Sequence, residues 1–237
     1  MREVIDQPLF GITLTLGAYA AAQGLHRRYP WVHPFVATTV FLLLMLVTAG
    51  YGCPIPGGLQ EYLQGYKVGG DYLTFLLGPA TVALAVPLYK NVVHIRRHVM
   101  PILAAIGVGA VVAIASGAGM VYALGNNPEI MRVMLPKSVT TPIAVEIVAQ
   151  LHGSRELGAT LVVLTGLFGA LVGARFLHLI GIRHELPLGL AMGTAAHGIG
   201  TATSLGHSEL RGMAAGLAMA LNGIVTSLLM IPLYPPP

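Results

Sequence analysis

The residues best suited to chemistry stand in one short polar stretch between long apolar runs. The stretch reads Lys137, Ser138, Val139, Thr140, Thr141 and Pro142. Proline suits the first turn of a helix, because its missing N–H would be unpaired there, and threonine suits the position just before it. We therefore expect a helix to begin at Pro142, with Thr141 as its N-cap and residues 137–141 partly unwound.

Such a helix start would form an anion-binding site. A helix N-terminus carries a partial positive charge and free N–H groups, and Lys137 adds a full charge beside them. Unwound backbone is not tolerated against lipid, so these residues would have to face a cavity. Two alternatives stay open: Lys137 could reach toward a membrane interface, and the Thr-Pro pair could simply kink a helix.

A second polar stretch, residues 193–202, contains one ionisable side chain, His197. Without bulky side chains, its backbone could approach a solute closely at Gly198, Gly200 and Thr201, after a helix break at Gly193. Histidine changes protonation near neutral pH, so His197 could carry a coupled proton, as could Glu146. The alternative is a packing histidine bonded to a carbonyl.

A third stretch has proline and a hydroxyl inside an apolar run. Gly78 and Pro79 indicate a helix start within the run, and Thr81 follows two residues later. We expect Thr81 to face the same cavity as Lys137.

No other residue combination forms a catalytic set. The chain has one cysteine, Cys53. His94 and His98 have the spacing of helical metal ligands, but they flank Arg96 and Arg97 and lack a nearby acid. We expect no enzymatic activity, no metal and no cofactor.

The composition indicates which elements hold these residues. The 237 residues are 55% hydrophobic and 9% charged, with a mean hydropathy of +0.75, whereas soluble domains are about 25% charged. A surface so poor in charge must face lipid. We expect one all-α, polytopic membrane bundle of roughly seven or eight segments, and not a nucleic-acid-binding protein, although the formal charge is +4.

Apolar runs of membrane-spanning length are expected at residues 8–25, 31–49, 72–89, 99–124, 157–180 and 213–233. Two weaker segments, 134–151 and 186–205, contain the polar stretches, and marginal segments are where transporters keep broken helices and binding sites. Residues 51–70 are expected to form an interfacial loop or a short surface helix.

The basic loop 90–98 is expected to lie in the cytoplasm. If every segment crosses once, Arg155 and Arg211 lie on the same side as this loop, and Arg183 is an exception. A segment that enters and leaves on one side would change this assignment.

The sequence resembles the LrgB/CidB family of bacterial membrane proteins, which has a plant relative, the plastid glycolate/glycerate transporter. Matching stretches are residues 76–90, 137–144 and 197–202, together with Tyr66, Gly69 and Gly70. The resemblance extends over roughly residues 9–232. The family often has Asn-Pro where this chain has His33-Pro34.

The resemblance implies one of two functions in a bacterial cytoplasmic membrane. One is transport of small carboxylates such as glycolate, glycerate or pyruvate. The other is an antiholin-like role with an LrgA/CidA-type partner, modulating murein hydrolase export and cell lysis. The anion site expected from the residues favours transport, with the acid held between Thr81, residues 137–141 and residues 197–201.

Pairs of glycines four residues apart indicate close helix contacts, within the bundle or across a homodimer. They are Gly169/Gly173, Gly189/Gly193 and Gly212/Gly216. A weak similarity between the motifs at residues 76–87 and 136–146, which pairs Thr81 with Thr140, further suggests repeat halves 1–124 and 125–237. The halves would be inverted if the motif segments are broken or re-entrant, and parallel if each crosses once.

Overall fold

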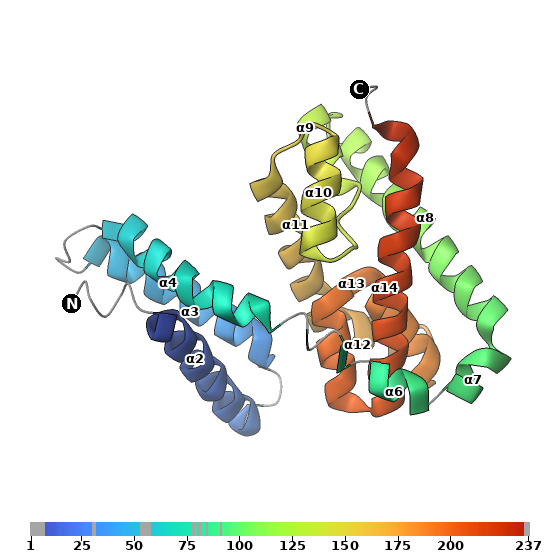
Figure 1. Ribbon diagram of the computed structural model, residues 1–237, viewed down its shortest axis with the longest axis horizontal. Helices are drawn as coiled ribbons and strands as arrows, with labels where there is room; N and C mark the ends of the chain where they lie inside the picture. The colour runs from blue at the N-terminus through green and yellow to red at the C-terminus, as the bar shows by residue number, and fades with distance from the viewer. Residues whose placement is uncertain are drawn as a thin grey trace. The chain divides into compact units, whose positions relative to one another are not determined.

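The computed structural model describes residues 8–29, 32–52, 58–76, 79, 82–83, 85–90 and 92–234. All regular elements among them are helices, as the all-α expectation requires (Figure 1). The chain divides into two compact units, Met1–Ala83 and Leu84–Pro237. The units therefore meet after Ala83, whereas the expected repeat halves, 1–124 and 125–237, would meet after residue 124. The repeat halves stay a prediction.

The first unit contains three helices that pack on one another: α2 (Pro8–Arg28), α3 (Pro34–Gly52) and α4 (Gly58–Phe75). α2 and α4 approach closely at Gly11 and Gly69, where a Cβ on either residue would lie within 3 Å of the other's Cα. Thr15 Oγ1 and Tyr66 OH, 3.1 Å apart, link the same two helices.

The expected segment at residues 72–89 lies partly outside the described residues, so a single crossing there stays a prediction. α4 ends at Phe75, and the next helix of the second unit, α6, covers only Ala85–Lys90. Residues 51–70 were expected to form an interfacial loop or a short surface helix. Within them, residues 58–70 are helical as part of the 18-residue α4, which is not among the helices apolar enough to cross a membrane. The helical signal was present, because Gln60, Gln64, Lys67 and Asp71 recur at helical spacing on one exposed face.

The second unit carries the polar stretches at residues 137–141 and 193–202. After α6 its elements are α7 (Val92–Arg97), α8 (Val99–Ala123), α9 (Pro128–Met134), α10 (Thr141–Gln150), α11 (Arg155–Phe168), η1 (Gly169–Gly173), α12 (Ala174–Leu179), α13 (Glu185–His207), α14 (Glu209–Met230) and η2 (Ile231–Leu233). Among the described residues, three stretches are long and apolar enough to cross a membrane: Val99–Ala123, Arg155–Leu179 and Glu209–Leu233. The full count of seven or eight segments stays a prediction.

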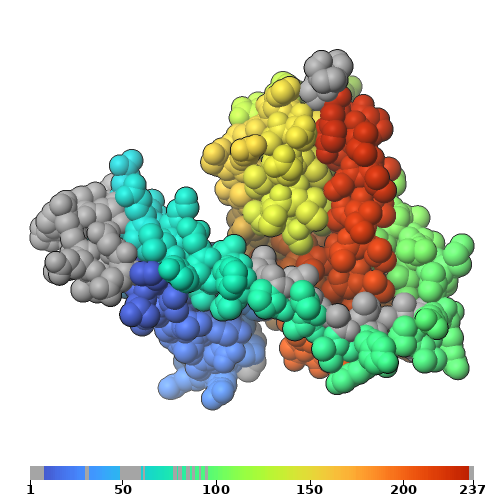
Figure 2. Space-filling view, in the orientation of Figure 1, coloured from blue at the N-terminus to red at the C-terminus, as the bar shows by residue number. Residues whose placement is uncertain are grey.

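The outer faces of α8 and α14 carry exposed apolar side chains, as expected of helices that contact lipid. They include Val108, Val111, Ile224 and Leu228. In Figure 2 both helices reach the outer surface of this unit. Their inner faces meet in a core that includes Ile106 and Ala218.

The first hairpin, residues 128–150, consists of α9, a turn at residues 135–140, and α10. Asn127 caps α9 by accepting hydrogen bonds from the backbone N–H groups of Glu129 and Ile130. Just after α10, the carbonyl of His152 accepts a 3.0 Å hydrogen bond from Arg132 Nη1 of α9. The chain therefore enters and leaves at the same end, with Lys137 in the turn.

The second hairpin is α13, which is broken at His197 (φ 39°, ψ −126°). Ser208 Oγ donates to Glu185 Oε2 at 2.7 Å, although an unbroken helix would separate these residues by about 34 Å. A Cβ on Gly200 would also touch the carbonyl oxygen of Met192. The two arms, residues 185–196 and 198–207, thus lie side by side.

The two hairpins enter the second unit from opposite ends. Figure 1 shows α9 and α10 beside the C-terminal end of α14, and α13 around its N-terminal end. The segments at 134–151 and 186–205, both expected to be marginal, are therefore parts of helical hairpins, and their re-entry into a membrane stays a prediction.

The glycine pairs make close contacts within the chain. A Cβ on Gly189 or Gly193 would touch the carbonyl oxygens of Arg211 and Ala215 on α14. Similarly, Gly169 and Gly173 lie against the first arm of α13, at Ala196 and Met192. Gly193 was expected to break the helix, and that is wrong: it lies within the helical arm, and the break is four residues later.

Candidate functional site

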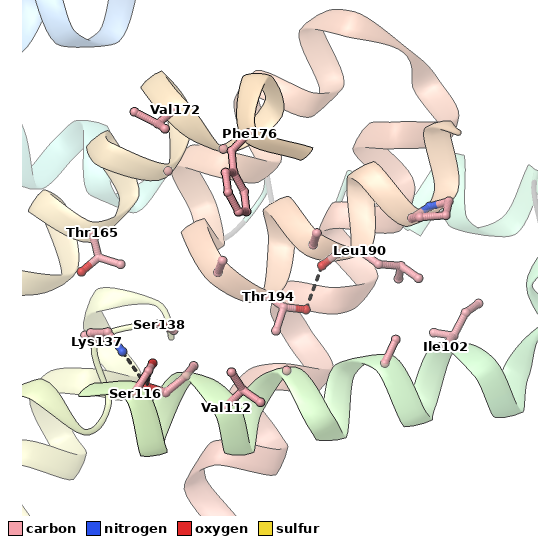
Figure 3. Close-up of a pocket in the computed structure, with 18 of the residues that line it drawn as sticks. Ile102, Val112, Ser116, Lys137, Ser138, Thr165, Val172, Phe176, Leu190 and Thr194 are labelled. Atoms are coloured by element: carbon pink, nitrogen blue, oxygen red, sulfur yellow. Dashed lines mark hydrogen bonds between the residues drawn. The ribbon is translucent and has the colours of Figure 1, made fainter. Parts of the chain in front are cut away.

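The turn of the first hairpin places Lys137 inside the second unit. Its Nζ donates a hydrogen bond to the carbonyl of Ala113 on α8, 2.6 Å away. Gly117, one turn further along α8, leaves room for the lysine, because a Cβ there would lie 3.0 Å from Nζ. Lys137 is half-buried, and it points toward α8 (Figure 3).

A pocket of about 1000 Å³ opens beside this lysine. It lies between α8, the hairpin turn, the stretch from α11 to α12, and the first arm of α13. Figure 3 shows Lys137, Ser138, Ser116 and Thr165 toward one end of the pocket. Apolar side chains line most of the remainder, including Ile102, Val112, Val172, Phe176 and Leu190.

Lys137 is the only aspartate, glutamate, lysine or arginine that lines this pocket in the described part of the chain. An ammonium group has three N–H donors, and Ala113 takes one of them. Two donors are thus left for another acceptor. The apolar surroundings would strengthen any electrostatic interaction that Lys137 makes with a ligand.

Of the hydroxyl residues next to Lys137, Ser138 lies in the turn before α10, and Thr140 and Thr141 lie at the start of that helix. Ser138 is buried and lines the pocket. The N-cap of α10 is Thr140, one residue earlier than expected, so that Thr141 is the first helical residue and Pro142 the second. Neither threonine is among the residues that line the pocket.

His197 forms the tip of the second hairpin. It is 4% exposed, and its Nε2 lies 2.9 Å from the carbonyl oxygen of Val162 on α11. Thr201 Oγ1 donates to the carbonyl of His197, while Gly200 packs against Met192 and Gly198 is exposed. The described pocket lining includes none of these three residues and not His197.

The remaining predicted residues lie elsewhere. Glu146 is exposed on α10, where its Oε1 accepts a 3.4 Å hydrogen bond from Gln150. Gly78 and Thr81 lie outside the described residues, and Pro79 is helical. The structure thus brings Lys137 and Ser138 together in the pocket and leaves Glu146 away from it.

The sequence analysis missed Asn222, which joins the two hairpins. It lies within α14, is 1% exposed, and donates through Nδ2 to the carbonyls of Ser138 (2.9 Å) and Thr194 (3.2 Å). A lone carboxamide inside an apolar run of membrane-spanning length was the available signal. Ser116, Thr165 and Thr194 gave none, since isolated hydroxyls are common in such helices.

In the described residues, no group of three or more His, Cys, Asp or Glu side chains could hold a metal ion.

Comparisons with known proteins show which family this chain resembles. The LrgB-like family matches residues 15–235. The uncharacterized protein YxaC of Bacillus subtilis is 35% identical over 91% of this chain and 90% of its own length. The uncharacterized protein YwbG of the same organism is 32% identical over 92% of this chain and 93% of its own length. The antiholin-like protein LrgB of Bacillus mycoides is 31% identical over 97% of this chain and 96% of its own. No solved structure matches.

Proposed function

Since the chain belongs to the LrgB-like family, we propose that it is a multi-pass permease of the bacterial cytoplasmic membrane that moves a small carboxylate. The observation that carries this proposal is the half-buried ammonium of Lys137 in an otherwise largely apolar pocket. We propose no chemical conversion of the solute.

The donors around Lys137 suit a carboxylate. Its two remaining N–H groups can make charge-assisted hydrogen bonds, which are shorter and stronger than neutral ones. Ser116 and Thr165 place hydroxyls toward the same end of the pocket. Each now donates to a carbonyl of its own helix, Ala113 and Leu161, and would have to turn away from it to donate to an acid. The pocket volume is at the upper end of the range for sites that bind drug-sized ligands. Selectivity for a small acid would therefore depend on these donors more than on the shape of the pocket.

The two hairpins support a transport role. Proteins that alternate access to a midplane site use broken helices whose ends face the solute, and they move one bundle against another. Here the two turns approach each other at Asn222, from opposite ends of the unit. Whether a proton on His197 or Glu146 is coupled to transport stays a prediction, as does a homodimer.

Uptake by purified protein in liposomes tests the proposal. We expect labelled glycolate, glycerate or pyruvate to accumulate, and Lys137→Ala to lower the initial rate at least about tenfold, a loss of roughly 1.4 kcal/mol. Lys67→Ala is the matched control, because Lys67 is an exposed lysine of α4. Flat uptake of all three acids by folded protein would reject the permease.

A second candidate function rests on the names of the relatives. Several proteins about 31% identical to this chain over nearly their whole length are named antiholin-like. These names support an antiholin-like regulator of murein hydrolase export better than they support a carboxylate permease. In this account the chain acts with an LrgA/CidA-type membrane partner.

The two functions differ in what they require. An antiholin-like role predicts that the chain co-purifies with a small holin-like protein, and that membrane leakage depends on both proteins. Leakage should then be unaffected by Lys137→Ala. If Lys137→Ala abolishes acid uptake while uptake needs no partner, the permease is supported.

A further inference from the structure

The strongest unexplained feature is the side-chain oxygen of Asn222. The carboxamide is 1% exposed, and its Nδ2 satisfies one carbonyl from each hairpin. Its Oδ1 is buried and accepts no hydrogen bond from any described residue. Nearly all buried polar atoms in native proteins have a partner, so such an exception indicates a bound water or ion.

The surroundings of Asn222 favour a cation. The carbonyl oxygens of Ser138 and Thr194 both lie within hydrogen-bonding distance of the carboxamide. Thr194 is in the last turn of the first arm of α13, which ends at the break at His197. The C-terminal end of a helix carries a partial negative charge and unpaired carbonyls.

We propose that Asn222 is the centre of a Na⁺ site that the carbonyls of Ser138 and Thr194 complete. Hard cations bind neutral oxygen ligands of this kind, and transporters use unwound carbonyls and half-helix C-termini to hold Na⁺. Rotating the carboxamide by half a turn would exchange Nδ2 and Oδ1. Oδ1 would then lie beside the two carbonyl oxygens, and Nδ2 would take the buried position that Oδ1 holds now. Three oxygens so close together are favourable only with a cation among them.

The two orientations of the carboxamide thus correspond to two states of the site. Without Na⁺, Nδ2 joins the two hairpins by hydrogen bonds. With Na⁺, Oδ1 and both carbonyls join them through the ion. In either state α14 holds the two hairpins together, which explains why a carboxamide suits position 222 better than an aliphatic side chain does.

A consequence for coupling rests on the proposed function. Ser138, whose carbonyl would bind Na⁺, directly follows Lys137, whose ammonium would bind the acid. Two positive charges close together in an apolar interior repel each other, and a carboxylate removes much of that repulsion. Acid and Na⁺ should therefore each increase the affinity for the other, by the same factor.

Thermal unfolding of the detergent-solubilised full chain tests the Na⁺ site. At constant ionic strength, replacing choline chloride with NaCl should raise the unfolding temperature in a saturable manner, because a ligand that binds only the folded state stabilises it. Asn222→Leu should abolish this rise. Ser227→Ala is the matched control, because Ser227 lies on the same helix and bonds only to the Gly223 carbonyl in the described structure.

Three results would overturn the Na⁺ site. The first is equal stability of the wild type in Na⁺ and choline, as a buried water alone would give. The second is an unchanged Na⁺ response in Asn222→Leu. The third is an equal response to K⁺. Should Asn222→Leu fail to fold, binding of ²²Na⁺ to the wild type, with and without excess K⁺, decides in its place.

Acid binding with and without Na⁺ separates this inference from the permease. We expect Na⁺ to increase the affinity for the acid at least about fivefold, the lower end of common coupling factors. A Na⁺ response without acid binding would leave the cation site standing and reject the permease. Acid binding that is identical in Na⁺ and choline, with no Na⁺ response in unfolding, would reject the cation site and leave the permease supported.

Discussion

The position of the Lys137 ammonium depends on a glycine of the facing helix. A Cβ at Gly117 would lie 3.0 Å from Nζ and 3.1 Å from the Met134 carbonyl oxygen. Both distances are tighter than ordinary contacts. The side chain at 117 therefore controls where the charge of Lys137 lies in the pocket.

We predict that Gly117→Ala displaces the Lys137 amine and weakens acid binding about tenfold. The control is Gly119→Ala, where a Cβ would meet nothing within 4 Å. Equilibrium binding of labelled acid to the purified variants measures both effects. Equal affinities of the two variants would show that the amine position is not critical.

A second residue-level prediction concerns the open end of the second hairpin. Arg211 donates two hydrogen bonds to Glu185, at 2.8 and 2.9 Å. These bonds, followed by that from Ser208, lower the pKa of Glu185 below its ordinary value of 4.5. The resulting stabilisation is fully present above that value and is lost as the pH falls through the lowered pKa.

We therefore predict that Glu185→Gln destabilises the protein at neutral pH by about 1–2 kcal/mol and removes this part of the acid-induced loss. Glu209→Gln is the control, because its partner Lys90 and Glu209 itself are more than half exposed and such pairs contribute little. Unfolding temperatures from pH 7 down to pH 3 provide the measurement. Parallel pH profiles for wild type and Glu185→Gln would contradict the assignment.

Single residues were predictable where type and position agreed. A helix start beside Pro142 was predictable because threonine and proline have strong local preferences for the N-cap and the first turn. His197 is at a break, but its ring bonds to Val162, 35 residues earlier. Asn222 bonds to a carbonyl 84 residues away, and local preferences carry no information about contacts so distant in sequence.

Among the elements, the two hairpins change the distribution of charge between the ends of the second unit. At the end where the second hairpin opens, the chain carries Lys90 on α6, Arg96 and Arg97 on α7, and Arg183 just before α13. At the other end, Arg132 and Arg155 stand beside Glu129 and Glu156. Arg183 would be an exception to the positive-inside rule if every segment crossed once. With two hairpins it lies at the same end as the other basic residues. From the positive-inside rule we therefore predict that the second hairpin's open end lies in the cytoplasm.

Single cysteines test this topology after Cys53, the only cysteine, is changed to serine. With two hairpins, Leu124→Cys and Arg155→Cys should react from the outside with a membrane-impermeant maleimide in intact cells. Arg183→Cys and His207→Cys should react only after lysis. Protection of one member within either pair would mean that the intervening segment crosses the membrane.

The hairpins were only partly predictable because hydropathy measures length and apolarity. Segments 134–151 and 186–205 were identified as marginal, but a window cannot distinguish a crossing from a turn. The break at His197, a residue with positive φ, has no glycine or proline at the same position to announce it. Gly193, which was expected to break the helix, instead permits backbone contact with α14.

At the scale of the whole molecule, the described pocket and both hairpins belong to the second unit, whereas the first unit has its own packing. There, Gly11 and Gly69 bring α2 and α4 into contact. A Cβ on Gly69 would lie 2.7 Å from the backbone nitrogen of Ile12, and no flexible side chain could move away to relieve the clash.

We predict that Gly69→Ala destabilises the protein by about 1–3 kcal/mol, the usual cost of overpacking. Gly70→Ala, one residue later, meets nothing within 4 Å and is the control. Thermal unfolding in detergent compares the two. The Na⁺ response should survive in Gly69→Ala, because Asn222 and both hairpins lie in the other unit; its loss would show that the units are not independent.

The overall helical class followed from composition alone, since a charge content of 9% leaves few alternatives to a lipid-facing bundle. The division into units did not. The expected segment at 72–89 spans the unit boundary, and apolar composition continues across it. Only contacts between distant residues define where one unit ends.

The hydrogen bond between Asn222 and Ser138 has a consequence for biogenesis. The two residues are 84 positions apart, and ribosomes add about 5–20 residues per second. The turn containing Ser138 is therefore made roughly 4–17 seconds before its partner exists. During that interval its polar groups must stay hydrated or be sheltered by the insertion machinery, so the first hairpin can reach its final depth only after the last helix has been synthesised.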